Sequence, residues 1–236
     1  NLTLDMAGFD REMEAQRERA RAASQFGLAD TGDLQLSYVT DFVGYDSLEE
    51  ESTVMGIIVD GAQVDQTCAD QEALVVLDRT PFYAESGGQS GDTGQLIADG
   101  VVLNVTDTVK SDDAFLHQGK SVSGSLSVGD KVQSLVNRPL RDATRLNHSA
   151  THLMHAALRK ILGEHVNQRG SLVNAERLRF DFSHFEPVSK EQLREIERLV
   201  NTEIRANSAI ETEVMGLELA RDKGAMALFG EKYSQE

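Results

Sequence analysis

The sequence predicts an α+β fold in which a small β-barrel is followed by a mixed region of helices and strands. Short β-rich runs recur at regular spacing from about Ser37 to Val136, and turn residues separate them. After Asn137-Arg138-Pro139 the pattern changes to amphipathic helices around one alternating strand. The expected parts are a helical linker over residues 1–36, a β-barrel over 37–136 and an α+β domain over 137–236.

Composition narrows the classes of protein to which the chain can belong. The 236 residues carry a formal net charge of −16, which argues against non-specific nucleic-acid binding by the whole surface. No apolar run of membrane-spanning length and no secretory leader is visible, so we expect no membrane partner. Cys68 is the single cysteine, which fits a reducing, cytoplasmic location. Because the chain begins at Asn1, we expect a piece of a longer protein.

The first expected element is a polar helix over residues 3–24. Its sequence is rich in helix formers, with Glu and Arg spaced to pair along the helix, and Thr3 and Asp5 offer capping oxygens. Gly27 and the polar stretch after it predict its end. The barrel strands follow, with turn pairs at Asp60-Gly61, Asp99-Gly100 and Gly129-Asp130.

The second half begins with a helix that carries most of the histidines. Asp142 or Thr144 is expected to cap this helix, and Gly163 to stop it after Leu162. The alternation in "RLRFDFSHF" predicts a half-buried strand. Three further elements are expected: a helix with a Ser189/Gln192 capping box, a strand over 210–218 and a last helix over 218–230.

Basic residues are concentrated around the histidines, although the whole chain is acidic. Between positions 138 and 180 this surplus favours either a phosphate-bearing partner or an ordinary mixed, solvated face. This stretch contains eight basic residues and only three acidic ones. The basic residues are Arg138, Arg141, Arg145, Arg159, Lys160, Arg169, Arg177 and Arg179, and the acidic ones are Asp142, Glu164 and Glu176.

His148 and His152 lie four residues apart on the predicted helix. This spacing lets both imidazoles reach one zinc ion. His155 is one turn further along, and three imidazoles in a row do not surround an ion, so we expect it to pack against the helix's neighbours. Cys68 has no Cys or His near it in the sequence. From spacing alone, two unconnected histidines at the surface or core edge are the more favoured interpretation.

The glycine-rich stretch "TPFYAESGGQSGDTG" (80–94) is the other conspicuous motif. Gly87 and Gly88 permit backbone conformations with positive φ and close approach to a ligand, and they can present Gln89. A long hairpin loop that needs glycines for its turns explains the stretch equally well. Gln168 and Arg169 follow the histidine helix, where an amide can orient a substrate group or merely occupy a strand edge. No GxSxG elbow supports a serine hydrolase.

Four stretches, in this order, resemble bacterial alanyl-tRNA synthetases in the part that follows their aminoacylation and tRNA-recognition domains. They are "TPFYAESGGQSGDTG", "NHSATHLMHAALRKILGEHVNQRGSLV", "RLRFDFSHFEPVS" and "ARDKGAMALFGEKY". The resemblance covers essentially the whole chain. It implies that residues 1–36 link from the tRNA-recognition domain. It also implies a small barrel followed by an α+β editing domain of the type shared by threonyl- and alanyl-tRNA synthetases.

The resemblance also implies an activity, the hydrolysis of Ser-tRNA(Ala) and Gly-tRNA(Ala). An alanine pocket cannot exclude glycine and rejects serine poorly, so a second site must supply the discrimination. The expected partner is the acceptor end of tRNA(Ala). By resemblance, the metal ligands are His148 and His152, the glutamine of the editing pocket is Gln168, and the loop that faces the pocket is Gly87, Gly88 and Gln89. Gln168 and Thr151 are the expected catalytic residues. The substrate-binding loop is expected to be joined by Arg169 and Ser171.

One departure from the family affects the zinc site. The family's other two zinc ligands, a Cys and a His, come after "GEKY", whereas this chain ends at "GEKYSQE". We therefore expect a half-site that binds zinc weakly or not at all, and impaired activity. ATP and Mg²⁺ belong to the absent aminoacylation domain. Two alternatives remain. One is a catalytically inactive module that binds the tRNA acceptor end. The other is a free-standing zinc hydrolase, against which the start at Asn1 without a Met and the missing zinc ligands at the other end both argue. The oligomeric state does not follow from the sequence.

Overall fold

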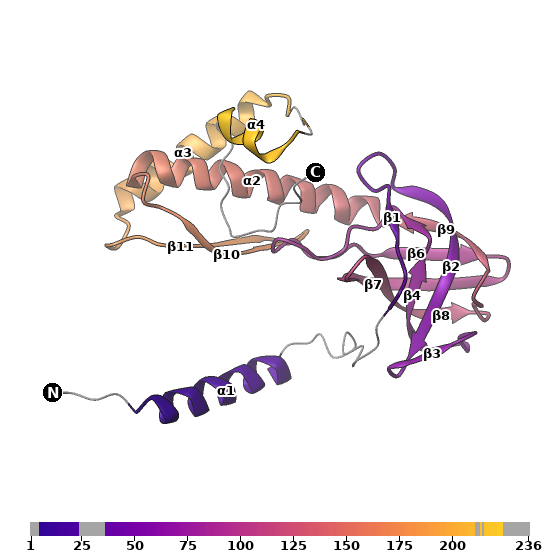
Figure 1. Cartoon of the computed structure of the whole chain (residues 1–236). Coiled ribbons are helices and arrows are strands. Elements are labelled where there is room, and N and C mark those ends of the chain that lie inside the picture. The colour runs from indigo at the N-terminus through magenta and orange to yellow at the C-terminus, as the bar shows by residue number, and fades with distance from the viewer. Residues whose placement is uncertain (1–4, 24–35, 211–212, 214, 224–236) are drawn as a thin grey trace.

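The computed structural model describes residues 5–23, 36–210, 213 and 215–223. A β-barrel stands at one side, and a long helix extends from it with a hairpin and a second helix along its length (Figure 1). The first helix, α1 (Met6–Ala23), confirms the predicted N-terminal helix. The Asp5 carboxylate accepts a hydrogen bond from the Gly8 amide at 2.9 Å, which confirms Asp5 as a capping residue of this helix. Thr3 and the predicted end near Gly27 lie outside the described residues.

Within the described residues, six antiparallel strands close into the predicted small barrel. The ring closes because the long strand β2 pairs with two different strands. Its first half pairs with β9 and its second half pairs with β4. The barrel strands, in spatial order, are β2 (Glu49–Val59), β4 (Glu72–Leu77), β8 (Ala114–Ser123), β7 (Val101–Ser111), β6 (Gly94–Ala98) and β9 (Lys131–Val136). Three short strands are attached outside this ring: β1 (Asp41–Phe42), β3 (Ala62–Val64) and β5 (Arg79–Thr80).

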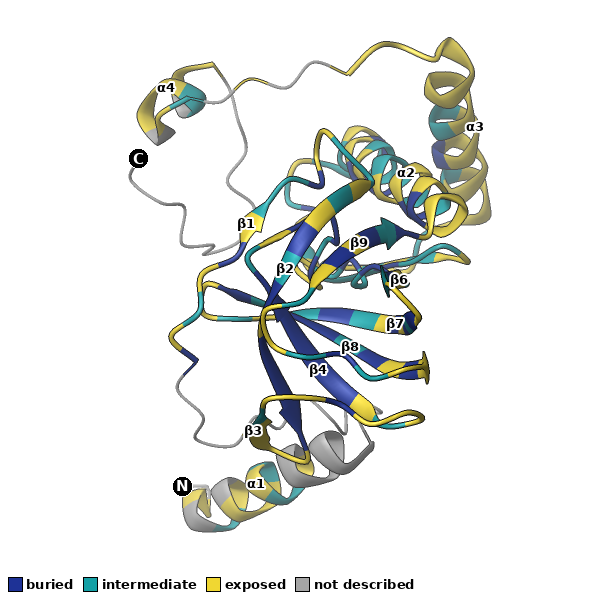
Figure 2. Ribbon diagram, turned by 90° about the vertical axis from the view of Figure 1, so that its right-hand side faces the viewer, coloured by how far each residue is buried: buried dark blue, intermediate teal, exposed yellow. Residues whose placement is uncertain are grey.

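Alternating side chains of the barrel strands fill its interior, which Figure 2 shows as bands of buried residues along the strands. Several buried residues of the barrel strands are polar, among them Ser52, Ser134 and His117. His117 has no exposed surface; its Nδ1 donates to the Val75 carbonyl at 2.9 Å and its Nε2 accepts from the Thr80 hydroxyl at 2.7 Å. Burial lowers the pKa of His117 to about 4, so the imidazole is neutral at pH 7.

Helix α2 (Arg138–Leu162) begins earlier than predicted. Its N-cap is Asn137, whose side chain accepts from the Leu140 amide at 3.3 Å, with a proline in the first turn. The prediction of Asp142 or Thr144 as the cap was therefore wrong, because Asn137 already caps the first turn. The predicted stop is confirmed: Gly163 follows the helix with φ of 117°.

A hairpin and one helix pack against the second half of α2. The hairpin is formed by β10 (Gln168–Val173) and β11 (Leu178–Phe182), which confirms the predicted alternating strand. Helix α3 (Lys190–Ala206) starts with both hydrogen bonds of the predicted Ser189/Gln192 capping box. Their apolar side chains form a second core around the following buried residues: Ala157, Leu158, Val166 and Ile196.

The predicted strand over 210–218 is not observed. Of that range, the described residues up to Gly216 are irregular, and Leu217 and Glu218 begin α4 (Leu217–Asp222). The prediction was wrong at Leu217 and Glu218, because the alternation is short and includes Gly216, which weakens a strand. The predicted last helix is present as α4 as far as Asp222, Lys223 forms a turn, and residues 224–230 lie outside the described residues. None of the helices in the described ranges is long and apolar enough to cross a membrane.

Candidate functional site

The glycine-rich loop turns tightly at Ser86–Gln89. The backbones of Ser86 and Gln89 exchange two hydrogen bonds of 3.2 and 2.9 Å. Gly87 and Gly88 between them have φ of 58° and 86°, as hairpin turns with two positive-φ residues require. The turn interpretation of these glycines is thus confirmed for this part of the loop.

Gly88 has a second role, because the loop comes very close to β10. A Cβ atom added at Gly88 would lie 2.5 Å from the Ser171 carbonyl oxygen, whereas one at Gly87 would meet nothing within 4 Å. The Val173 amide donates to the Gly88 carbonyl at 2.7 Å, and the Ser90 amide donates to the Val173 carbonyl at 3.0 Å. The barrel loop and the hairpin are therefore joined through their backbones.

This junction places Gln89 against the first of the paired histidines. Gln89 is 7% exposed, and its Oε1 accepts a hydrogen bond from Nδ1 of His148 at 2.6 Å. Protonation of Nδ1 leaves the Nε2 lone pair of His148 unprotonated, and this atom lies 3.1 Å from Nε2 of His152. A side-chain oxygen that fixes the second nitrogen of a histidine is the usual support of a metal ligand.

The two Nε2 atoms fit one zinc ion. With Zn–N bonds of about 2.0–2.1 Å, nitrogens 3.1 Å apart subtend an angle of roughly 100° at the metal, near the tetrahedral value. Burial, and then the neighbouring His152, lower the pKa of His148 and favour the neutral form that binds metals. Within the described part of the chain, no third His, Cys, Asp or Glu joins the pair.

His155 is a packing residue, as predicted. It is 4% exposed, and its ring lies 5.1 Å from the ring of Phe180 in the second core. Cys68 is an exposed free thiol, and its backbone amide donates to the side chain of Gln71 at 2.8 Å.

The other predicted site residues occupy three different settings. The Thr151 hydroxyl donates to the Asn147 carbonyl of its own helix at 2.8 Å, and the side chain is 7% exposed. Gln168 is half-buried at the start of β10, about 16 Å of strand away from Val173. Arg169 is exposed at a bulge in the β10–β11 pairing, and half-buried Ser171 faces Gly88.

Sequence reasoning missed the ion pair that fixes α2 to the barrel. Arg141 and Asp92 are each 7% exposed at the side chain. The guanidinium donates to both carboxylate oxygens and to the carbonyls of Gly44 and Pro81, and Asp92 also accepts from the Tyr83 amide. Arg141 therefore does not belong to the exposed basic surplus in which it was counted. The available signal was an aspartate within the glycine-rich stretch.

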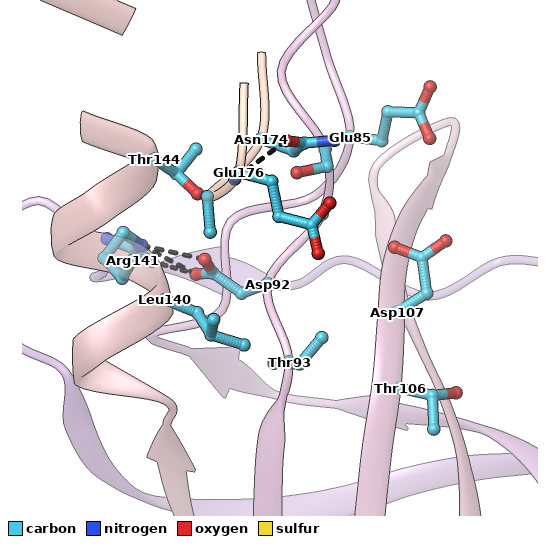
Figure 3. Close-up of a pocket in the computed structure, with 13 residues that line it drawn as sticks. Glu85, Asp92, Thr93, Thr106, Asp107, Leu140, Arg141, Thr144, Asn174 and Glu176 are labelled. Carbon is cyan, nitrogen blue, oxygen red and sulfur yellow. Dashed lines mark hydrogen bonds and ion pairs between the residues drawn. The ribbon is translucent and has the colours of Figure 1, made fainter. Parts of the chain in front are cut away.

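A cleft of about 450 Å³ lies beside this ion pair, between α2 and the barrel (Figure 3). The carboxylates of Glu85, Asp107 and Glu176 border it, and the Arg141–Asp92 pair forms part of its wall. Burial raises the pKa of both Glu85 and Asp107, and for Glu85 the charge of Asp107 adds to that effect. This acidic cleft would repel phosphate groups.

Comparisons with known proteins point in one direction. Residues 1–140 match the family described as tRNA synthetases class II (A). The alanine–tRNA ligase of Pseudomonas entomophila (strain L48) is 55% identical over 232 residues, which are 98% of this chain and 26% of that protein. The alanine–tRNA ligase of Saccharophagus degradans (strain 2-40) is 54% identical over 235 residues, 100% of this chain and 27% of that protein. The chain spans about a quarter of the length of these relatives, and the predicted resemblance to alanyl-tRNA synthetases is confirmed.

Proposed function

Because this chain belongs to the class II (A) family of tRNA synthetases, we propose that it is the editing region of an alanine–tRNA ligase. Its reaction is hydrolysis of the ester that joins serine or glycine to tRNA(Ala). Water adds to the ester carbonyl, and the 3′ oxygen of the tRNA leaves as a hydroxyl. The parent enzyme joins alanine to tRNA(Ala) with ATP and Mg²⁺ at an aminoacylation domain outside this region.

The hydrogen-bonded row Gln89–His148–His152 is the observation that supports this proposal most directly. Gln89 orients His148, and the two Nε2 atoms converge on one point, as two ligands of a zinc ion do. Bound zinc would supply a positive charge that orients the substrate or polarises a water molecule. Gln168 is proposed to hold the substrate by its amide, and the Gly87–Gln89 turn to border the pocket.

Two histidines alone make a weak zinc site, since structural and catalytic zinc have at least three protein ligands. The family's Cys and His after the "GEKY" stretch are the proposed remaining ligands. A binding module for the tRNA acceptor end is the second candidate, and the presence of only two candidate ligands among the described residues favours it.

One experiment separates these functions. Ser-tRNA(Ala) is mixed with the 236-residue chain, and separately with a longer version that carries the next twenty or so residues of its relatives, and ester loss is followed. We expect hydrolysis by the longer version and little or none by the shorter one. If neither version hydrolyses the ester but both bind the tRNA, the editing proposal is wrong and the binding module stands.

Two substitutions test the assigned residues in the complete ligase. His148→Ala and Gln168→Ala should each raise the steady-state level of Ser-tRNA(Ala), while the rate of alanine charging stays within about twofold. Asn201→Ala on the exposed face of α3 serves as the control and should change neither. Loss of alanine charging in both variants would show that these residues maintain the fold instead.

A further inference from the structure

A second cleft, of about 440 Å³, lies at the start of α2. The loop of residues 44–49 forms one wall, and Arg138 and Arg145 form the other. Both arginines are exposed, and among the residues that the structure describes no carboxylate lies within ion-pair distance of either guanidinium. Asp46 and Glu49 also line the cleft, yet neither is paired with these arginines. Two guanidinium groups therefore remain available to an anionic ligand.

The arginines lie on the same stripe of α2 as one of the histidines. Arg138, Arg145 and His152 follow one another at intervals of seven residues. Each such interval rotates the position by only about 20° around the helix. Each step advances about 10.5 Å, so the row from Arg138 to His152 is about 21 Å long. That length corresponds to about six stacked nucleotides of one strand, and fewer where the strand is extended.

An aromatic ring completes the cleft. Tyr45 is 85% exposed and touches Phe42 edge to face, with ring centroids 5.0 Å apart. This contact supports Tyr45 on one side, while its large exposed area remains available to a planar group. Exposed aromatic rings beside basic side chains are the usual means of binding single-stranded nucleic acid.

The adjoining face of α2, which borders the acidic cleft, is unsuitable for such a strand. Leu140, Arg141 and Thr144 border the acidic cleft, where Arg141 is already paired with Asp92. A polyanion that reaches the histidine pair along α2 is therefore directed to the side of Arg138 and Arg145.

We propose that the cleft of Arg138, Arg145 and Tyr45 binds the single-stranded 3′ end of an RNA as it enters the histidine site. The arginines contact successive regions of the phosphate backbone, and Tyr45 stacks on one base. This inference rests on the proposed editing function, because it assigns the path of the same substrate. It adds three contact residues that do not take part in the hydrolysis.

The test uses an eight-nucleotide RNA that ends in CCA, carries a 5′ fluorophore and has no amino acid attached. Its binding to the 236-residue chain is followed by anisotropy over a range of salt concentrations. The double variant Arg138→Ala/Arg145→Ala should bind at least tenfold more weakly. Its slope of log K against log salt should be smaller by about 1.4, as expected for two lost phosphate contacts. Arg138→Lys/Arg145→Lys should restore most of the slope.

A matched control removes the same charge elsewhere. Arg194→Ala/Arg198→Ala, on exposed positions of α3, should leave both affinity and slope unchanged. Tyr45→Ala should weaken binding roughly tenfold without changing the slope, since a stacking contact releases no counterions. Circular dichroism checks that each variant keeps its fold. Equal binding by the arginine double variant and the unaltered chain would overturn the proposal.

Further results distinguish this proposal from an unspecific anion site, from a protein contact and from the editing function itself. A polyglutamate peptide that displaces the RNA at equal charge would show an unspecific anion site or a protein contact, and would overturn the RNA assignment. Because the probe has no ester, failure of Ser-tRNA(Ala) hydrolysis with arginine-dependent RNA binding refutes only the editing function. Conversely, hydrolysis whose KM is unchanged in the arginine double variant refutes only the RNA path.

Discussion

Oε1 of Gln89, in the barrel loop, accepts a hydrogen bond from Nδ1 of His148, on α2, at 2.6 Å. The bond crosses the junction between the barrel and the α+β part, so the barrel takes part in the site. It also fixes which nitrogen of His148 faces His152.

Replacing Gln89 tests this support. Gln89→Ala should lower zinc affinity by about 10- to 100-fold in a chain that carries all the proposed ligands, because the imidazole loses its orienting partner. Competition with a chelator measures that affinity. Gln89→Glu keeps an acceptor oxygen and serves as the control, with zinc affinity at least as high as in the unaltered chain. Equal affinity in all three proteins would show that Gln89 has no role in metal binding.

The Arg141–Asp92 pair should contribute to folding through its burial. Asp92→Ala leaves an uncompensated buried guanidinium, and the free energy of unfolding should fall by about 3–5 kcal/mol. Urea unfolding followed by circular dichroism measures the change. Arg79→Ala, which removes exposed ion pairs with Asp41 and Glu50, should cost no more than about 1 kcal/mol. Similar losses in the two variants would contradict the structural role assigned to Asp92.

Two neighbouring glycines offer a matched comparison of backbone conformation and steric contact. Both have positive φ, so Gly87→Ala and Gly88→Ala should each cost about 1 kcal/mol of stability for the backbone. Only Gly88→Ala forces an atom against the Ser171 carbonyl, so it should also break the junction with β10. Hydrogen exchange of the Val173 amide should quicken in that variant alone. Equal protection of this amide in both variants would refute the close-contact role of Gly88.

The buried His117 should make the barrel sensitive to acid. Its pKa falls from an ordinary 6.5 to about 4, so between these pH values the unfolded chain binds a proton that the folded chain does not. The stabilisation is complete above about pH 6.5 and is lost as the pH falls toward 4, a change of roughly 3 kcal/mol. Urea unfolding from pH 7 to 4 measures it.

His117→Leu removes the titrating group and is the reference for that measurement. Although the variant is less stable at pH 7, the difference in unfolding free energy between it and the unaltered chain should shrink on acidification. Parallel curves over this pH range would show that His117 does not titrate on unfolding.

Much of the architecture could be predicted because it depends on local patterns. The capping box at Ser189 and the stop at Gly163 are set by a few neighbouring residues, and both are observed. The barrel followed from the regular alternation of short strands and turns. Asp142 and Thr144 were wrong as caps because two polar residues inside a helix look, in sequence, like those that begin one.

The site was less predictable because its contacts are distant in sequence. His148 and Gln89 are 59 residues apart, and Arg141 and Asp92 are 49 apart, so neither partner could be inferred from spacing. The resemblance to a family placed Gln89 near the pocket without indicating which atom it would hold. His155 was correctly predicted to be a packing residue, because its position relative to His148 and His152 depends only on the spacing along one helix.

The backbone junction between Gly88 and Val173 has a consequence for protein engineering. A graft that moved α2 and its hairpin to another scaffold would carry both histidines and still lose their support. The smallest unit that can be transplanted must include the turn of residues 86–89 and Asp92, which pairs with Arg141 of α2. Both are part of the barrel. Transfer of this site between proteins therefore requires moving the barrel with it.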